Sequence, residues 1–475
     1  MTRGNEWTLD PARGLPADSA TRAHALEIFR HTQHLPLVSM HGHVEADLFL
    51  RNETFGNPAE LLIIPDHYLV RMLVSQGHSH AELGVPSKDG SVVESDPRAI
   101  WRLFCRNWKL FRGTPTRFWL EHELAIVFGA TTAPSEETAD ALYDELQASL
   151  NTEAFRPRSI LERFKVEILA TTDPAISDLA AHHKLAQLPG NHTIVPTFRP
   201  DSLLHVRNSQ WQKEIRTLSQ VSGVEVGDYS TFLAALRQRR TAFIAAGARA
   251  TDHGHLSADT TPLPPADAQR IFAAALTGTA TAREAEAFAA NMIFEMARMS
   301  TEDGLVMQLH PGVLRNHNAN VLGTYGPDTG FDIPVKMEFT RALAPMLDAF
   351  GMNPDFRVIA FTTDETVYSR ELAPLAGAYP AMRLGAPWWF LDSPEQMRRF
   401  RESAVETAGF YNTSGFVDDT RALASVPARH DLSRRIDAGY LARLVAEGRL
   451  GLDEGIETAI DLAYNLPLQS YAART

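Results

Sequence analysis

The chain has little cysteine and no long apolar run. Cys105 is the single cysteine in 475 residues, which excludes an intrachain disulfide and a CxxC-type zinc site. Residues 1–6 are polar and lead into no apolar segment, and no stretch of 18 apolar residues occurs in the sequence. The sequence therefore predicts neither a signal peptide nor a transmembrane helix. We expect a cytoplasmic protein without a membrane partner.

Positive charge is scarce relative to negative charge. Lys and Arg total 45 against 58 Asp and Glu, which gives a net charge of −13. Binding to nucleic acid depends on basic side chains that neutralise phosphates, so we expect no nucleic-acid partner. The apolar fraction of 44% is typical of a globular chain. The length suits either about three ordinary domains or one large α/β barrel with insertions.

Short apolar runs that end in polar residues recur along the chain. Helical periodicity fills several gaps between these runs, for example over 282–299, and such alternation predicts βαβ units with a parallel sheet. Eight units predict a single (β/α)8 TIM-type barrel over residues 1–475, with its active site at the carboxyl ends of the strands. The expected strands are 35–40, 166–170, 193–196, 248–251, 305–309, 358–361, 382–385 and 414–417.

The gap between the first two expected strands is much longer than one helix requires. Residues 45–164 therefore predict a large, mostly helical insertion. Because this insertion follows the first strand, we expect it to lie over the active-site face of the barrel and to contribute residues to the site.

Two histidines, His41 and His43, directly follow the first expected strand. Alternate residues of a strand point to the same side, and two neutral imidazoles form part of a ligand shell for Zn²⁺ or another divalent metal. The same spacing occurs at 78–80, which we interpret as solvated surface, and at 253–255. Only the first pair follows a strongly apolar strand. Packing or hydrogen bonding of the two rings is the alternative interpretation.

A mononuclear metal site needs a further ligand and an open position. Asp419 follows the eighth expected strand, which lies beside the first strand in a closed barrel, and His310 follows the fifth. Either residue could complete the shell, and Asp419 could instead act as an acid or base. The acidic pair 418–419 could also be an ordinary loop feature.

Three arginines, Arg199, Arg315 and Arg421, also follow expected strands. A guanidinium binds a carboxylate through two hydrogen bonds, so this group indicates an anionic substrate. Salt bridges at the surface are the common alternative for any one of them. Trp389 lies in a run of aromatic residues. Such runs more often belong to the hydrophobic core, although a sugar could pack against the indole of Trp389.

Several motifs, in the order in which they stand here, resemble those of uronate isomerases, a family of the amidohydrolase superfamily with a distorted (β/α)8 barrel. The segments are HxH at 41–43, FGNxxEL at 55–61, DHY at 66–68 followed by Arg71, TTD at 171–173, PTFRPD at 196–201, an SDHG-like 251–254, QLHxGxxRN at 308–316, DTGFD at 328–332, WWFxDSPE at 388–395, DDTR at 418–421 and ARHD at 428–431.

The resemblance implies an aldose–ketose isomerase that moves hydrogen between C2 and C1. The reaction would interconvert D-glucuronate with D-fructuronate, D-galacturonate with D-tagaturonate, or both pairs. It implies a small hexuronate substrate, a divalent metal that we expect to be zinc, and a homo-oligomer. The implied metal ligands are His41, His43 and Asp419 with His310 close by, the implied catalytic residues are Tyr68, His67, Asp419 and Asp252, and the implied substrate-binding residues are Arg199, Arg315, Arg421 and Trp389.

The chain departs from the family pattern beside the first histidine. Ser39 and Gly42 stand where the family usually has Asp and Cys, so we expect a different set of contacts around the metal. At 364–365 the chain has Asp-Glu where the family often has Asn-Pro, and 63–65 differs from the usual polar lead into the DHY motif. These changes bear on which sugar acid is preferred.

The nearest rival is a metal-dependent hydrolase of the same superfamily, acting on a small carboxylate-bearing substrate. Two-metal members use a carboxylated lysine at the end of the fourth strand, where this chain has Asp252. A one-metal hydrolase or deaminase is the surviving alternative, and a catalytically silent sugar-acid-binding protein is another. None of the lysines falls at that strand end, since they stand at 88, 109, 165, 184, 213 and 336.

Overall fold

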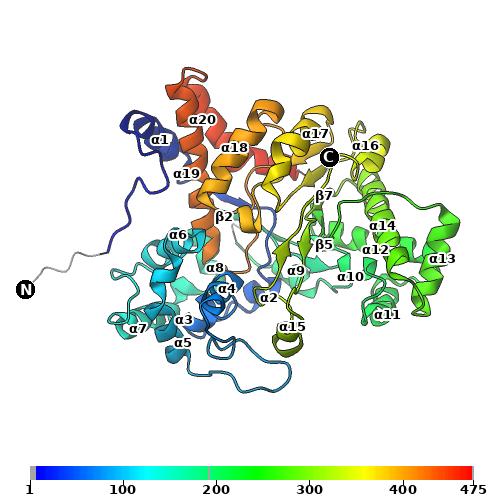
Figure 1. Ribbon diagram of the computed structural model, residues 1–475, viewed down its shortest axis with the longest axis horizontal. Coiled ribbons are helices and arrows are strands. Elements are labelled where there is room, and N and C mark those ends of the chain that lie inside the picture. The colour runs from blue at the N-terminus through cyan, green and yellow to red at the C-terminus, as the bar shows by residue number, and fades with distance from the viewer. Residues whose placement is uncertain (1–6, 191–192, 473–475) are drawn as a thin grey trace, which may run out of the picture.

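A computed structural model describes residues 7–190 and 193–472 (Figure 1). The polar segment 1–6, on which the expectation about a signal peptide depends, lies outside the described residues. Within the described part of the chain, no helix is both long and apolar enough to cross a membrane. Cys105 is buried as a free thiol.

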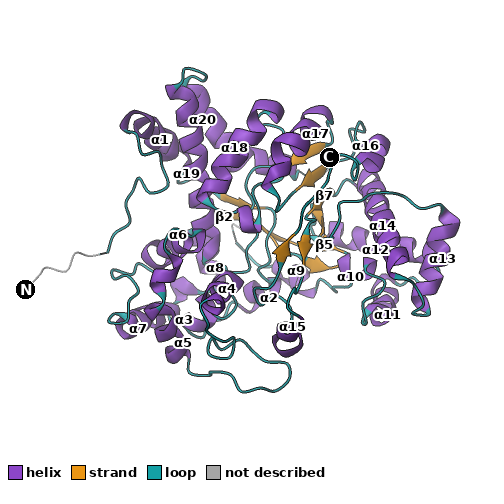
Figure 2. Ribbon diagram, viewed as in Figure 1, coloured by secondary structure: helices purple, strands orange, loops and turns teal. Residues whose placement is uncertain are grey.

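Parallel strands form the centre of the molecule, and helices surround them (Figure 2). The two sheets continue into each other, because β2 leads into β3 and β4 into β5 after a break of two residues. One sheet has the order β1 (Leu37–Ser39), β2 (Val166–Ala170), β4 (Thr193–Val195), and the other has the order β11 (Met382–Leu384), β10 (Val358–Ala360), β7 (Val306–Leu309), β6 (Ala250–His253), β5 (Phe198–Arg199), β3 (Asp173–Pro174).

The eighth expected strand, 414–417, lies in its expected place but is not a regular strand. It meets β11 in a parallel bridge between Leu384 and Thr413. The backbone then bends at Gly415, whose φ of 78° is left-handed and whose absent Cβ would lie 2.4 Å from a ring carbon of Pro467. The prediction of a regular strand at 414–417 was therefore wrong, because the chain turns to clear the C-terminal helix.

Backbone hydrogen bonds close the ring between this segment and the end of β1. The N–H of Asp419 donates to the carbonyl of His41 at 3.2 Å, and the N–H of His43 donates to the carbonyl of Thr420 at 2.9 Å. The fold is thus a (β/α)8 barrel, as expected. The closing hydrogen bonds place the residues after the eighth strand position directly beside the two histidines.

β6 begins two residues later than expected, at Ala250. The residues at 248–251 have low β-propensity, and pairing with β7 defines the strand, with partners running from Ala250–Val306 to His253–Leu309. Asp252 and His253 therefore belong to the strand itself.

The inserted segment between β1 and β2 is helical, as expected, and forms a group beside the barrel, blue to cyan in Figure 1. A separate apolar core with Trp101, Phe104, Phe111 and Leu146 holds it together. Its helices are α2 (Ala46–Arg51), α3 (Pro58–Leu62), α4 (His67–Ser75), α5 (Pro97–Arg106), α6 (Pro115–His122), α7 (Ala139–Leu150) and α8 (Pro157–Arg163).

The remaining helices connect or cover the barrel strands. The periodic segment 282–299 forms the first part of α14. Thr281 caps the start of this helix, and Gly304 caps its end. These helices are α1 (Ser19–Thr32), α9 (Ala180–Leu185), α10 (Asp201–Leu204), α11 (Trp211–Ser222), α12 (Tyr229–Ala245), α13 (Pro265–Leu276), α14 (Ala282–Asp303), α15 (Ala319–Tyr325), α16 (Ala344–Phe350), α17 (Ala373–Ala378), α18 (Pro394–Ala408), α19 (Ser425–Ala446), α20 (Leu452–Ile460) and α21 (Leu466–Ser470).

Candidate active site

A cavity of about 360 Å³ opens between the carboxyl ends of the strands and the inserted helices. This volume suits a small molecule. Both predicted catalytic residues of the insertion and all three predicted arginines line it. Its lining includes His43, Pro65, Asp66, His67, Tyr68, Arg199, Arg315, Asn316, Trp388, Trp389, Asp419, Thr420, Arg421 and Arg429.

The barrel side of the cavity, which we call the floor, centres on Asp419. Its Oδ1 lies 3.3 Å from Nε2 of His41 and 2.9 Å from Nε2 of His43. Asp419 has a φ of 42°, a left-handed conformation that costs about 1–3 kcal/mol and that barrel closure maintains. Asp418 instead faces His430, with Oδ2 3.2 Å from Nε2. The two acids of this pair are therefore not equivalent, and only Asp419 faces the histidines.

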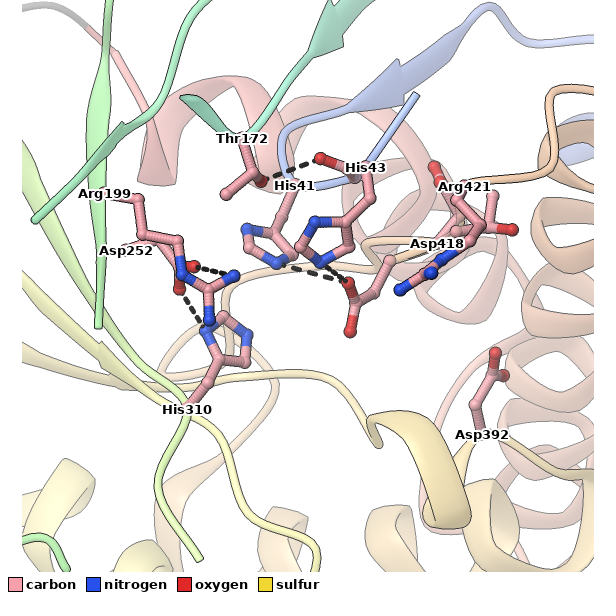
Figure 3. A network of polar contacts seen from close by, with 12 residues as sticks. His41, His43, Thr172, Arg199, Asp252, His310, Asp392, Asp418 and Arg421 are labelled. Carbon is pink, nitrogen blue, oxygen red and sulfur yellow. Dashed lines mark hydrogen bonds and ion pairs between the residues drawn. The ribbon is translucent and has the colours of Figure 1, made fainter. Parts of the chain in front are cut away.

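Asp252 and His310 extend the floor on the side of β6 and β7 (Figure 3). Nδ1 of His310 lies 2.7 Å from Oδ1 of Asp252, and the His310 ring stacks on His41 with centroids 4.4 Å apart. The second oxygen of Asp252 lies 3.3 Å from Nη1 of Arg199. The structure thus brings together all four predicted metal ligands and Asp252.

The floor has the donors and the electrostatic potential of a cation site. Two groups of three residues, which share His41, offer ligand atoms within 4.8 Å of one another: one adds His43 and Asp419, and the other adds Asp252 and His310. Nδ1 of His41 and Nε2 of His310 are buried without a hydrogen-bond partner.

The charges of these groups also favour binding of a cation at the floor. Burial lowers the pKa of His41, but Asp252 and Asp419 outweigh burial and raise it above its usual value. Burial opposes ionisation of Asp419, yet His41 and His43 hold its pKa well below the usual range. Imidazole and carboxylate donors suit a divalent transition metal. The residues present therefore fit such an ion.

The opposite side of the cavity, which we call the roof, comes from the start of α4. Asp66 caps this helix, because its Oδ1 accepts hydrogen bonds from the backbone N–H groups of Tyr68 at 2.8 Å and Leu69 at 3.2 Å. The rings of His67 and Tyr68 stack with centroids 4.4 Å apart. Burial lowers the pKa of His67 to about 3 and raises that of Tyr68 above its usual value. Both side chains are therefore uncharged at neutral pH.

Behind Tyr68 lies a buried group to which the sequence assigned no role. The Arg429 guanidinium lies 5.3 Å from the Tyr68 ring centroid and 3.9 Å from that of Trp119, and its Nη1 donates to Oδ2 of Asp392 at 2.6 Å. Arg429 and Asp392 belong to the ARHD and WWFxDSPE motifs, so those motifs contained the signal. Glu123 lies nearby, and burial raises its pKa to about 7.

The predicted substrate-binding residues all reach the cavity, but their availability differs. Arg199 is engaged by Asp201 and Asp252 and is 27% exposed. Arg315 is 40% exposed, donates to Asp332 at 3.1 Å and lies 4.6 Å from the Trp389 ring centroid.

Arg421 is the most loosely held of the three arginines. Its side chain is 38% exposed, and its Nη2 lies 3.6 Å from Oδ2 of Asp328. Arg315 and Arg421 therefore have hydrogen-bonding capacity left for a ligand, whereas that of Arg199 is mostly used within the protein.

The two other HxH pairs lie away from this site. The interpretation of 78–80 as solvated surface was wrong for His80, which is 4% exposed, stacks on Tyr325 and has its Nε2 3.1 Å from the carbonyl of Thr329. His253 and His255 are both buried beside Asp201.

A (β/α)8 barrel with histidines and acids at its strand ends, under a helical insertion, defines an enzyme of the amidohydrolase-like barrel class. A family model described as glucuronate isomerase matches residues 19–471. The chain belongs to this glucuronate isomerase family, which confirms the resemblance seen in the motifs.

Relatives match along almost the whole chain. A protein named uronate isomerase from Rhizobium meliloti (strain 1021) is 50% identical over 463 residues, which cover 98% of this chain and 99% of that protein. The crystal structure of glucuronate isomerase from Caulobacter crescentus is 46% identical, with a TM-score of 0.96 and coverage of 98% of both chains. That of uronate isomerase from Thermotoga maritima is 26% identical, with a TM-score of 0.91, and covers 98% of this chain and 100% of that one.

Proposed function

We propose that this protein is a uronate isomerase that interconverts D-glucuronate with D-fructuronate, D-galacturonate with D-tagaturonate, or both pairs. One observation carries this proposal beyond family membership. The ionised carboxylate of Asp419 and the uncharged side chains of Tyr68 and His67 line the same cavity, together with three arginines. A base, neutral hydrogen-bond donors and anion-binding groups are what the isomerisation of an acidic sugar requires.

Arg315 and Arg421 bind the substrate carboxylate in this proposal. Both retain free N–H donors at the cavity, and a guanidinium matches a carboxylate with two hydrogen bonds. Trp389 packs against the sugar and fixes the orientation of Arg315, whose guanidinium lies over its ring.

Asp419 acts as the base. Its carboxylate takes the proton from C2 of the open-chain aldose, and the electron pair of that C–H bond becomes the C1=C2 bond of a cis-enediolate. The Tyr68 hydroxyl donates a hydrogen bond to the negative oxygen on C1, with neutral His67 beside it. The hydroxyl proton then moves from O2 to O1, the carbonyl forms at C2, and Asp419 returns its proton to C1 on the same face. No proton is gained or lost overall.

Asp252, which we expected among the catalytic residues, is not among the residues that line the cavity, and in this proposal it acts by positioning its neighbours. One of its oxygens holds Nδ1 of His310 and the other holds Arg199. The Arg199 contact and the His310 contact together outweigh burial and keep the pKa of Asp252 well below its usual value. This carboxylate therefore fixes both side chains at the edge of the cavity.

A divalent metal, which we propose to be zinc, would be held by His41, His43 and Asp419, with His310 close by. When bound, it supplies positive charge that stabilises negative oxygens of the substrate. Both histidines approach the same oxygen of Asp419, so the other oxygen remains for the proton transfer.

Three further properties belong to this proposal. We propose that the protein is cytoplasmic, that it forms a homo-oligomer, and that residues 45–164 and the barrel act as one domain. Contact between Tyr68 of the insertion and Arg429 of α19 supports the last of these. Metal analysis and size-exclusion chromatography test the ion and the assembly.

The experiment that tests the function follows D-glucuronate and D-galacturonate by NMR with purified protein. We expect a ketose product from at least one of them. The same mixture of aldose and ketose should be reached whether the reaction starts from the aldose or from the ketose. No turnover of either hexuronate, together with hydrolysis of a lactone or an amide, would support a hydrolase instead and would refute the proposal.

A further inference from the structure

A second cluster of possible metal ligands lies outside the cavity. It consists of Asp201 at the start of α10, His253 at the end of β6 and His255 two residues further on. The three side chains offer ligand atoms within 4.8 Å of one another. Relative exposures are 8% for Asp201, 1% for His253 and 6% for His255. None of the three lines the active-site cavity described above.

Each residue contributes one buried polar atom that has no hydrogen-bond partner. These atoms are Oδ1 of Asp201, Nδ1 of His253 and Nε2 of His255. Leaving a buried polar group without a hydrogen-bond partner is destabilising, so three such groups in one cluster require an explanation.

The other atoms of two of these side chains already have partners. Oδ2 of Asp201 accepts hydrogen bonds from Nε of Arg199 at 2.8 Å and from the N–H of Gly254 at 2.9 Å. Nε2 of His253 lies 2.9 Å from the Thr251 hydroxyl. The atoms without partners are therefore the ones left to bind something else.

The donor set also suits a metal. Two imidazoles and one carboxylate are ligand types that Zn²⁺ and similar transition metals bind. A single ion among the three side chains would take one ligand atom from each of them.

The separation of two of the ligand atoms also suits a tetrahedral ion. Ligands at about 2.0–2.1 Å from Zn²⁺ lie about 3.4 Å from one another in a tetrahedron. Nε2 of His255 and Oδ1 of Asp201 are 3.7 Å apart. His255 also lines a groove of about 600 Å³ with His205, Asn208 and Leu256.

We propose that Asp201, His253 and His255 form a second site for Zn²⁺ or a similar divalent transition metal, separate from the one at the floor. The ion has a structural role, because coordination of one oxygen of Asp201 fixes the other oxygen, which holds Arg199. Through Arg199 the second site supports Asp252 and hence the floor.

The test counts metal ions in the full-length protein after chelator treatment and reloading with Zn²⁺, using calorimetric titration and elemental analysis. Wild type should bind two equivalents per chain, and His255→Ala and His43→Ala should each bind one. His205→Ala, which removes an exposed histidine of the same groove, is the matched control and should still bind two. Two equivalents in His255→Ala, or one in wild type that His255→Ala retains, would refute the second site.

One further outcome separates this proposal from the proposed function. If wild type binds one equivalent that His255→Ala loses and His43→Ala keeps, the second site stands and the metal at the floor does not. Should His255→Ala fail to fold, titration of the stripped wild-type protein with Co²⁺ gives an independent answer. Two successive changes in the visible absorption spectrum support two sites, and a single change that His43→Ala abolishes refutes the second.

Discussion

The floor and the roof of the cavity present opposite chemistry from differently built regions. The floor consists of residues after β1 and β7, within β6 and after the eighth strand position, and the backbone hydrogen bonds of the barrel hold them together. The roof consists of two adjacent residues on a helix of the insertion, held by packing against Trp119, Trp389 and Arg429.

The floor and the roof also differ in the charge of their side chains. Mutual contacts keep the carboxylates of the floor ionised despite burial, as the low pKa values of Asp252 and Asp419 indicate. Burial keeps the side chains of the roof uncharged, so the pKa of His67 is lowered and that of Tyr68 is raised. In the proposed reaction, the floor therefore supplies a base and a place for a cation, and the roof supplies hydrogen bonds without adding charge.

The largest expected effect is at the floor, in Asp419→Asn. This change removes the base and one metal ligand while it keeps the shape of the side chain, so kcat/KM should fall about 1000-fold or more. Metal binding at the floor should weaken as well. Turnover assays, metal analysis and circular dichroism check the prediction. A folded Asp419→Asn variant within about tenfold of wild type would show that the floor does not supply the base.

At the roof, Tyr68→Phe should cost less. The ring and its packing remain and only the hydroxyl is lost, so kcat should fall about 100- to 1000-fold through loss of one hydrogen bond to the enediolate. KM, metal content and thermal stability should change little, which distinguishes this variant from Asp419→Asn. Equal loss of metal in both variants would mean that the two sides are not chemically separate.

Between floor and roof, Arg315→Ala should act mainly on binding. Loss of a charged hydrogen bond of about 1.5–3 kcal/mol should raise KM about 10- to 100-fold, with a smaller change in kcat. Arg237→Ala is the matched control, since it removes an arginine that pairs with Glu302 at the surface. A fall in kcat at constant KM would instead place Arg315 in the chemical step.

The smallest effect on activity, with a clear effect on stability, is expected for Glu123→Gln behind the roof. The pKa of Glu123 in the folded protein is raised from 4.5 to about 7, so its stabilising contribution is complete below pH 4.5 and is lost as pH rises through 7. The loss at pH 8.5 is about 3 kcal/mol.

The glutamine variant lacks this titration. It should resemble wild type near pH 4.5 and exceed its free energy of unfolding at pH 8.5, as measured by urea denaturation at both values. Glu136→Gln, at an exposed glutamate, serves as the control and should leave the difference between the two pH values unchanged. An equal pH dependence in Glu123→Gln and wild type would contradict the account of the roof as a region that excludes charge.

How far the sequence predicts each region follows from how each is built. The floor was predictable because parallel strands bring their carboxyl ends to one edge, so His41, His310 and Asp419 could be placed together from local patterns alone. The irregular eighth strand was not, because its bend at Gly415 depends on contact with Pro467 far along the chain.

The roof could not be placed from local patterns. His67 and Tyr68 begin a short amphipathic helix like many others, and only the family motif singled them out. Arg429 and Glu123 resemble ordinary polar positions of helical segments, and their burial arises from contacts between the insertion and α19. The second cluster was equally hidden, since the HxH spacing at 253–255 acquires its third member, Asp201, only through pairing of β5 with β6.

The measurement that tests the joint action of floor and roof most directly follows the hydrogen at C2. D-Glucuronate deuterated at C2 is converted in ordinary water, and the product is analysed by NMR at C1. Proton transfer through Asp419 in an open cavity predicts a ketose in which protium has replaced part of the deuterium at C1. Complete transfer of deuterium to C1, both in wild type and in the slower Tyr68→Phe variant, would indicate a direct hydride shift and would contradict the account.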